Sequence, residues 1–417
     1  LKPMGEKGSQ VIVNGKPIGN FPAKDYYKMK DSVKQSAFKA YDRISKKYDL
    51  IILEGAGSPA EINLMEEDFV NMAMAEYAGA GVVLVADIDR GGVFASIYGT
   101  VSLLPEKYRK LIKGIIINKF RGDQDLLESG IKQIERLTGI PVLGVLPFIR
   151  NLRIEEEDSL GLDGRSEEQD AILDIAVIRL PHISNYTDFM VFENTNGVSL
   201  RYIAEADEAG SPDMFIIPGT KNTRADLQFL HESGWSDRLT EAVSRKIPVI
   251  GICGGYQMLG SRVVDPSGVE GEKGCDIGLN LLPVTTVLEP RKELAQVEGL
   301  TTKEFIFAKP GTSFKGYEIH AGRTTATISD DHFLIVKQRL GEKVEGKAGS
   351  ISENGLVFGC YIHGFFDAQS LRCQLLDWLC KRKDIKPLNW DLEDSEAEFD
   401  RLADIMEEKL ELASIAS

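Results

Sequence analysis

The sequence predicts an α/β protein with two parallel-sheet domains. Two series of short apolar runs, bounded by glycine or charged residues and separated by stretches that look helical, support this prediction. The runs are residues 49–54, 81–87, 114–119 and 141–146, then 174–180, 214–218, 247–251 and 356–362. Continuously apolar strands that alternate with helices are typical of parallel sheets buried on both faces. The 417 residues also exceed the roughly 250–300 at which a single core stops growing, which favours two domains.

Composition shifts divide the chain into four parts. Residues 1–154 form the first predicted domain, and residues 155–171, which are acidic and lack periodicity, form a linker. Residues 172–386 form the second domain and residues 387–417 a helical tail. The tail carries apolar residues at helical spacing among acids, which predicts an amphipathic helix docked on the body. They are Phe399, Leu402, Ile405, Met406 and Leu410.

Charge and composition exclude several classes of protein. The formal net charge of -15 argues against general nucleic-acid binding but leaves room for an anionic small substrate in a locally basic pocket. No apolar run approaches the roughly 18 residues that a membrane span requires. Five cysteines without metal-binding spacing indicate a reducing compartment, and we expect a cytoplasmic protein. The sequence gives no indication of the oligomeric state.

The strongest chemical signal is Cys253, which follows an apolar strand and lies between Gly251 and the pair Gly254 and Gly255. A cysteine is more commonly a small core residue, but a core cysteine does not need glycine on both sides. A sharp strand–turn–helix connection lifts a nucleophile out of the backbone. A second apolar strand, residues 355–362, ends on His363. Cys253 and His363 are therefore the predicted thiol nucleophile and base.

The other four cysteines are predicted to be structural. Cys360 lies within a strand, and Cys373 and Cys380 are seven residues apart in a helix-like run. Cys275 lies in a glycine-rich segment, predicted to be a loop, with no base near it in sequence.

A Pro-Gly turn follows the strand that is expected to neighbour the strand of Cys253. Gly219 and Thr220 in this turn could present a backbone N–H beside that of Gly254 and so form an oxyanion hole. The alternative is an ordinary turn with no ligand.

Polar residues follow the strands of the first domain, where ligands of open parallel sheets bind. Glu54 and Asp87 each end a strand, and such acids commonly hold Mg²⁺. Arg90 is suited to binding an anionic group. Asn118 begins an Asn-Lys dipeptide that resembles those with which many nucleotide-binding folds recognise a purine ring. Acids at strand ends are also often helix caps. The string at 341–348 imitates a phosphate loop, but it ends in alanine, follows no apolar strand and is predicted to be an ordinary polar loop.

Residues 316–324 contain several polar side chains close to glycines, a composition typical of a binding surface. Tyr317, Glu318, His320 and Arg323 are the residues concerned. Among the histidines, His182 is also expected to be related to a site.

Eight stretches distributed in order along the chain resemble the cobyric acid synthase family of glutamine-dependent amidotransferases. They are residues 1–16, 54–64, 87–96, 117–122, 183–188, 251–260, 316–320 and 361–364. The resemblance implies a synthetase domain similar to dethiobiotin synthetase, followed by a class I-like glutaminase domain.

The resemblance also implies a reaction. Glutamine would be hydrolysed at Cys253 through a thioester with His363 as base, and ATP with Mg²⁺ would phosphorylate a corrinoid carboxylate that ammonia then amidates. In the family these are the b, d, e and g carboxylates of adenosylcobyrinic acid a,c-diamide. Glu54 and Asp87 would serve Mg²⁺ and phosphoryl transfer, and Asn118 the adenine. Candidates for the corrinoid site are Arg90, Tyr317 and Arg323.

Two departures from the family pattern shape the expectations. Class I glutaminases usually place a glutamate two residues after the histidine to orient it, whereas this chain has Phe365. Glu318 and Asp367 are the suggested replacements. The strand, phosphate loop and helix that begin the family are not found, so we expect a synthase that is N-terminally incomplete and whose glutaminase half is complete.

Three other interpretations remain open. A cobyrinic acid a,c-diamide synthase shares the architecture and amidates two other carboxylates. A relative that acts on cell-wall lipid divides the two activities between separate chains. A non-catalytic corrinoid-binding protein, or a fragment with glutaminase activity alone, would keep the fold without a working ATP site.

Overall fold

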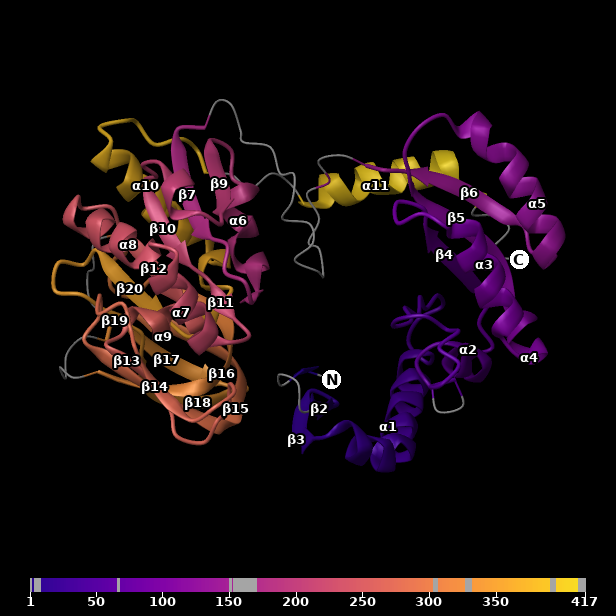
Figure 1. The fold of residues 1–417 in the computed structure, drawn as a ribbon, viewed down its shortest axis with the longest axis horizontal. Helices are drawn as coiled ribbons and strands as arrows, with labels where there is room; N and C mark the ends of the chain where they lie inside the picture. The colour runs from indigo at the N-terminus through magenta and orange to yellow at the C-terminus, as the bar shows by residue number, and fades with distance from the viewer. Residues whose placement is uncertain are drawn as a thin grey trace. The chain divides into compact units, whose positions relative to one another are not determined.

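The computed structural model describes residues 2–3, 9–65, 68–149, 152, 171–302, 307–326, 332–390 and 395–411. The chain folds into two compact units, coloured along the sequence in Figure 1. The first comprises Leu1–Leu152 with Glu396–Ser417, and the second comprises Arg153–Ser395. The predicted linker lies, except for residue 171, outside the described residues.

The first unit contains a parallel sheet in the order β4-β5-β6, formed by Val82–Asp87, Ile112–Phe120 and Val142–Pro147. These strands confirm three of the four predicted for this part. Ile115 and Ile117 of β5 are fully buried in a cluster with side chains of the flanking helices α3 and α5. These helices span Val93–Leu103 and Glu128–Thr138. The short helix α4 (Glu106–Arg109) and the 3-10 turn η1 (Gln124–Leu127) complete the connections.

The first unit also has a small antiparallel sheet, β1-β2-β3, formed by Lys2–Pro3, Ser9–Val13 and Lys16–Phe21. Helices α1 (Ala23–Ile44) and α2 (Met72–Ala78) follow along the chain. The strand predicted at residues 49–54 is wrong, because these residues adopt no regular structure. Leu50 and Ile52 are 79% and 87% exposed. A strand requires a partner for its backbone groups, and no strand in the described part of the chain pairs with this segment.

The tail helix α11 spans Ser395–Lys409 and belongs to the first unit. Leu410 forms an isolated bridge with Gly144 and is buried beside Leu143 and Leu146. Phe399, at the other end of the helix, is exposed. The apolar face predicted for the tail is therefore buried only near its C-terminal end.

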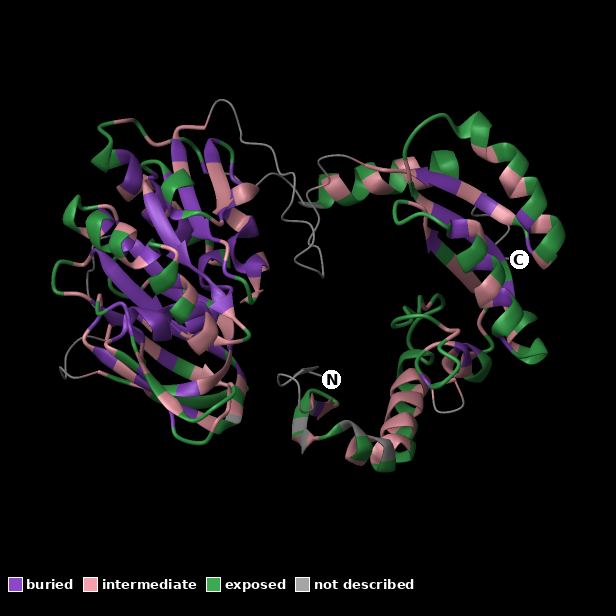
Figure 2. Ribbon diagram, in the orientation of Figure 1, coloured by how far each residue is buried: buried purple, intermediate pink, exposed green. Residues whose placement is uncertain are grey.

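The second unit is built on a sheet in the order β19-β20-β12-β10-β7-β9, whose buried strands are visible in Figure 2. The strands from β20 to β9 are parallel, and β19 is antiparallel to β20. Their bounds are Ser350–Ile351, Val357–Cys360, Val249–Ile252, Met214–Ile217, Leu173–Ile178 and Val198–Ile203. All four strands predicted for this unit are confirmed, and β9 and β19 are additional.

Helices cover this sheet, and apolar clusters fill the space between them. The helices are α6 (Met190–Glu193), α7 (Thr223–Glu232), α8 (Trp235–Ser244), α9 (Gly254–Leu259) and α10 (Gln369–Arg382). Leu375 and Leu379 of α10 pack in one cluster with Ile250 of β12, and Trp235 of α8 packs in another with Phe215 of β10.

A second, mostly antiparallel sheet was not predicted. It contains β13 (Arg262–Asp265), β14 (Gly274–Ile277), β15 (Val284–Thr301), β16 (Ser313–Ala326), β17 (Leu334–Arg339), β18 (Glu342–Ala348) and β21 (Ile362–His363). Cys275 therefore lies in a strand, not in the predicted loop. The string that imitates a phosphate loop is not the predicted loop: Gly341 lies in a turn and residues 342–348 form β18, which pairs with β17. No helix in the described ranges is long and apolar enough to cross a membrane.

Candidate active site

Cys253 lies at a strained turn between the central strand β12 and helix α9. Its φ and ψ angles are 52° and -109°, a conformation that costs a non-glycine residue about 1–3 kcal/mol. Hydrogen bonds hold the residue on both sides: its N–H donates to the carbonyl of Cys360 at 2.9 Å, and its carbonyl accepts from the N–H of Gln257 at 3.1 Å. Strain of this kind is typical of a nucleophile elbow.

The glycines around Cys253 allow three backbone segments to approach one another closely. A Cβ on Gly251 would lie 2.6 Å from the carbonyl carbon of Gly255. A Cβ on Gly254 would lie 2.5 Å from Cγ2 of Thr220, and one on Gly255 would collide with the carbonyl oxygen of Ile217. Gly254 and Gly255 therefore allow the elbow, defined as residues 251–255, to pack against Thr220 and the end of β10, and Gly251 allows α9 to start close to β12.

His363 ends β21, which pairs with β16, and its side chain is 1% exposed. Its Nδ1 lies 2.6 Å from Oδ2 of Asp188, and the N–H of Gly364 donates to Oδ1 of the same carboxylate at 3.0 Å. A carboxylate accepts hydrogen bonds, so Nδ1 carries the proton. Nε2 is buried without a hydrogen-bond partner among the described residues.

Asp188, in the 3-10 turn η3 (Tyr186–Phe189), corrects both suggested partners of His363. The carboxylate of Glu318 instead lies 2.8 Å from Arg339, and the hydrogen bond at Nδ1 is to Asp188. Asp188 was missed as a partner, although it ends the stretch 183–188 that contributed to the family resemblance.

Buried charges control the protonation of His363. Burial disfavours the imidazolium, but Cys253 and Asp188 outweigh burial and raise the pKa of His363 to about 10. The Cys253 thiol itself donates to the carbonyl of Ile319 in β16, with Sγ and the oxygen 3.4 Å apart. The charges around His363 therefore favour its imidazolium form.

Tyr317, a candidate for the corrinoid site, lies against His363. The two rings stack with their centroids 5.1 Å apart and an interplanar angle of 22°. The hydroxyl of Tyr317 accepts a hydrogen bond from Nδ2 of Asn185 at 2.6 Å. Burial, together with the charge of Asp188, raises the pKa of Tyr317 to about 12, so the phenol stays neutral.

Gly219 and Thr220, the candidates for the oxyanion hole, form β11, which pairs with β8 (Ile183–Ser184). The Thr220 hydroxyl donates to the fully buried carboxylate of Asp226, which also lies 2.7 Å from Nδ1 of His182. A Cβ on Gly254 would lie 3.1 Å from the backbone nitrogen of Thr220. The segment predicted to stabilise an oxyanion therefore lies beside the elbow.

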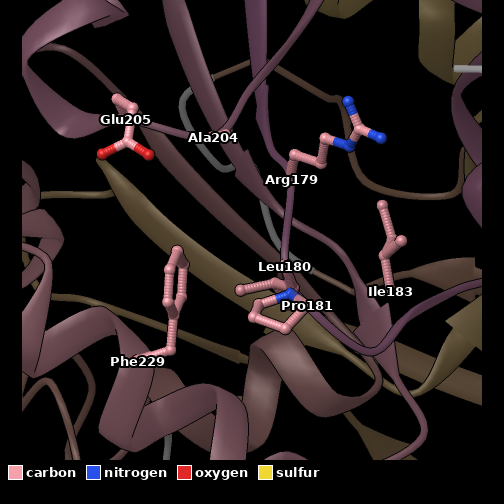
Figure 3. Close-up of a pocket in the computed structure, with 7 residues that line it drawn as sticks. All are labelled: Arg179, Leu180, Pro181, Ile183, Ala204, Glu205 and Phe229. Atoms are coloured by element: carbon pink, nitrogen blue, oxygen red, sulfur yellow. The ribbon is translucent and has the colours of Figure 1, made fainter. Parts of the chain in front are cut away.

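The remaining residues of the stretch 316–324 face a pocket of about 290 Å³. Glu318, His320 and Arg323 line it. Arg339 makes ion pairs with Glu318 and Glu293, but burial outweighs Arg339 and raises the pKa of Glu318. Arg323 pairs with Glu289. A cavity of about 350 Å³ lies near the carboxyl ends of β7 and β9, and Figure 3 shows the residues that line it. They are Arg179, Leu180, Pro181, Ile183, Ala204, Glu205 and Phe229, and none of them was predicted to carry chemistry.

In the first unit, Asp87 and Asn118 are paired residues at the carboxyl ends of β4 and β5. Oδ2 of Asp87 accepts from Nζ of Lys119 at 3.1 Å. Burial raises the pKa of Asp87, but the hydrogen bonds from Lys119 and from the N–H of Asp89 lower it more, so the group is ionised below its usual pH range. An ionised carboxylate at a strand end fits a Mg²⁺ ligand.

Glu54 and Arg90, two further candidates in the first unit, are both exposed. Glu54 is exposed in an irregular segment whose next residues are held by hydrogen bonds between Asn71 and Ala56. No contact between Glu54 and Asp87 is found within the described ranges. Arg90 is exposed in the turn after β4, where its charge contributes to lowering the pKa of Asp87.

Both units match known protein families. Residues 174–371 match the family described as "CobB/CobQ-like glutamine amidotransferase domain", and residues 20–156 match an AAA domain. The chain is 44% identical to a cobyric acid synthase of Alkaliphilus metalliredigens, with 100% of this chain and 84% of that protein aligned. For the cobyric acid synthase of Streptococcus sanguinis the identity is 42%, with 100% and 83% aligned.

A solved structure of PurLQS from Thermotoga maritima is also similar, at 18% identity and a TM-score of 0.39, over 50% of this chain and 99% of that one.

Proposed function

Because the chain belongs to the cobyric acid synthase family, we propose that it converts adenosylcobyrinic acid a,c-diamide to cobyric acid. The reaction amidates the b, d, e and g carboxylates, with ammonia from glutamine and energy from ATP. The observation that carries the glutaminase half is Cys253 on its strained elbow, beside a buried His363.

The first half-reaction takes place in the second unit. His363 accepts the proton of the Cys253 thiol at Nε2, and the thiolate attacks the carboxamide carbon of glutamine. The backbone N–H groups of Gly254 and Thr220 are the candidates to stabilise the oxyanion. Ammonia leaves with the proton from His363, and water hydrolyses the thioester to release glutamate and restore the thiol.

The second half-reaction belongs to the first unit. A corrinoid carboxylate takes the γ-phosphoryl group of ATP, and ammonia displaces phosphate to leave the amide. Asp87, with Glu54, is the candidate ligand of Mg²⁺, which would neutralise the charge of the phosphates. The Lys119 ammonium beside Asp87 adds positive charge at the same sheet edge. Asn118 is proposed to contact the adenine, and Arg90 and Arg323 to contact the corrinoid.

The main alternative amidates the a and c carboxylates on the same architecture. Similarity along the whole of this chain to proteins named cobyric acid synthase favours the b, d, e and g carboxylates. The two alternatives predict different products from the same corrinoid and are separated by mass.

The glutaminase half is tested by replacing the nucleophile. We expect Cys253→Ala to lower glutamate release by at least about 10⁴-fold, because the thioester cannot form. Cys275→Ala, which removes an exposed free cysteine of the same unit, is the matched control and should keep wild-type activity. Glutamate release is measured by a coupled dehydrogenase assay. Undiminished release by the Cys253→Ala protein would show that the proposed nucleophile is wrong.

A further inference from the structure

In class I glutaminases a glutamate two residues after the catalytic histidine usually orients the imidazole, and this chain has a phenylalanine at that place. Phe365, two residues after His363, is 1% exposed and packs against Phe314 and Phe333, with ring centroids 5.7 and 6.5 Å apart. Its apolar side chain offers no acceptor for the Nδ1 proton. The orienting group must therefore come from another part of the fold.

Asp188 uses both of its carboxylate oxygens at the histidine. Oδ2 accepts from Nδ1 of His363, and Oδ1 accepts from the N–H of Gly364, the next residue. Asp188 is 6% exposed, so the two hydrogen bonds form in an environment where they are stronger than in water. The carboxylate thus holds the imidazole and the backbone that carries it as one unit.

The same short segment also supports the face of the imidazole. Asn185, three residues before Asp188, donates to the hydroxyl of Tyr317, whose ring stacks on His363. Just before Asn185, strand β8 pairs with Gly219 and Thr220 beside the elbow. Residues 183–188 therefore contact the edge of the imidazole, the ring stacked on it and the predicted oxyanion segment.

We propose that the glutaminase centre is a Cys253–His363–Asp188 triad, in which Asp188 is a positioning residue supplied from upstream of β9 in place of the usual carboxylate after the histidine. The inference rests on the proposed glutaminase function. Asp188 keeps the proton of His363 on Nδ1, directs Nε2 to the substrate side, and stabilises the imidazolium when Nε2 takes the thiol proton. Asp188 does not itself exchange a proton in this cycle.

The test compares Asp188→Asn, Asp188→Glu and Asp265→Asn in the full chain. Asp265 is a matched control, because it is also a buried aspartate of the second unit and accepts hydrogen bonds from the N–H groups of Val269 and Glu270. Asp188→Asn should lower kcat for glutamate release by about 10²- to 10⁴-fold, with little change in KM. Asp188→Glu should restore part of that loss, and Asp265→Asn should keep wild-type kcat.

The pH profile of Cys253 alkylation by iodoacetamide separates positioning from general stability. His363 is faced by Asp188 from η3, by Cys253 from the end of β12, and by Tyr317 and His320 from β16. Loss of the Asp188 charge destabilises the imidazolium of His363, so the alkylation profile should differ from that of wild type in Asp188→Asn. No shift is expected in Asp265→Asn.

Three results would overturn the inference. They are a kcat of Asp188→Asn within about twofold of wild type, an unchanged alkylation profile despite lost activity, or equal losses in Asp265→Asn. If Asp188→Asn does not fold, NMR of ¹⁵N-histidine in the wild-type protein decides: a strongly downfield, exchange-protected Nδ1 proton of His363, the sign of a hydrogen bond to a carboxylate, supports the triad, and its absence contradicts it. Failure of the proposed function is distinguishable, because the wild-type chain would then release no glutamate.

Discussion

His363 keeps its proton well above the pH at which an exposed histidine loses it. Burial alone would do the opposite, since an imidazolium is poorly solvated in a protein interior. The adjacent Cys253 and Asp188 reverse that effect and raise the pKa of His363 to about 10. The raised pKa favours the imidazolium that forms when Nε2 of His363 takes the proton of the thiol.

This raised pKa predicts a pH dependence of stability. The folded protein retains a proton that the unfolded chain releases near a pKa of about 6.5. The stabilisation is therefore complete below about pH 6.5 and is lost as the pH rises through the folded pKa of about 10. Chemical unfolding of wild type and His363→Asn should give free energies whose difference falls across this range. A difference that stays constant across this range would contradict the raised pKa of His363.

Sequence reasoning predicted the site residues that have local signals, and it did not predict Asp188, which has none. Cys253 is marked by its flanking glycines, and His363 by its place at the end of an apolar strand. Asp188 carries no comparable signal, because its hydrogen bond to His363 joins residues 175 positions apart. Such a contact depends on how η3 and β21 meet in the folded unit.

At the scale of elements, the site depends on how closely helix α9 packs against the ends of β10 and β12. The backbone of Gly255 lies directly against the carbonyl of Ile217, so the helix can start immediately after the nucleophile. Any side chain at this position would push α9 away from the sheet and move the elbow.

We therefore expect Gly255→Ala to lower the free energy of unfolding by about 1–3 kcal/mol, the usual range for overpacking in a core. Gly346→Ala is the matched control, because a Cβ on this strand glycine of the same unit would contact nothing within 4 Å. Urea titration measures both variants. Equal stabilities of the two variants would refute the claim that close packing requires Gly255.

Parallel strands were predicted more successfully than the antiparallel sheet. The strands β7, β10, β12 and β20 are continuous apolar runs, which burial on both faces requires. Strands β15 and β16 mix polar, charged and glycine residues over 18 and 14 positions, so no short apolar run marks them. The converse error at residues 49–54 arose because an apolar run forms a strand only where a partner strand is present.

At the scale of the whole molecule, the two compact units match two different domain families. The proposed account gives each unit one half-reaction, with glutamine hydrolysis in the second and ATP-dependent amidation in the first. A substitution in the ATP-binding site of the first unit should therefore lower amidation without lowering glutamine hydrolysis.

Asp87→Asn is expected to keep wild-type glutamate release and to lower amidation by about 10²-fold or more, because the carboxylate proposed to hold Mg²⁺ becomes neutral. Asp125→Asn, at an exposed aspartate of the same unit, is the control and should affect neither activity. Glutamate and corrinoid products are quantified in the same reactions. Normal amidation by Asp87→Asn would exclude the proposed metal ligand.

The central claim is tested most directly by the product. The chain is incubated with glutamine, Mg-ATP and adenosylcobyrinic acid a,c-diamide, and the corrinoid is followed by mass spectrometry. The account predicts four successive conversions of an acid to an amide, ending at cobyric acid, and none when Cys253 is replaced by alanine and no ammonium salt is added. A corrinoid that stays unchanged while glutamate is released would contradict the synthase assignment and favour a protein with glutaminase activity alone.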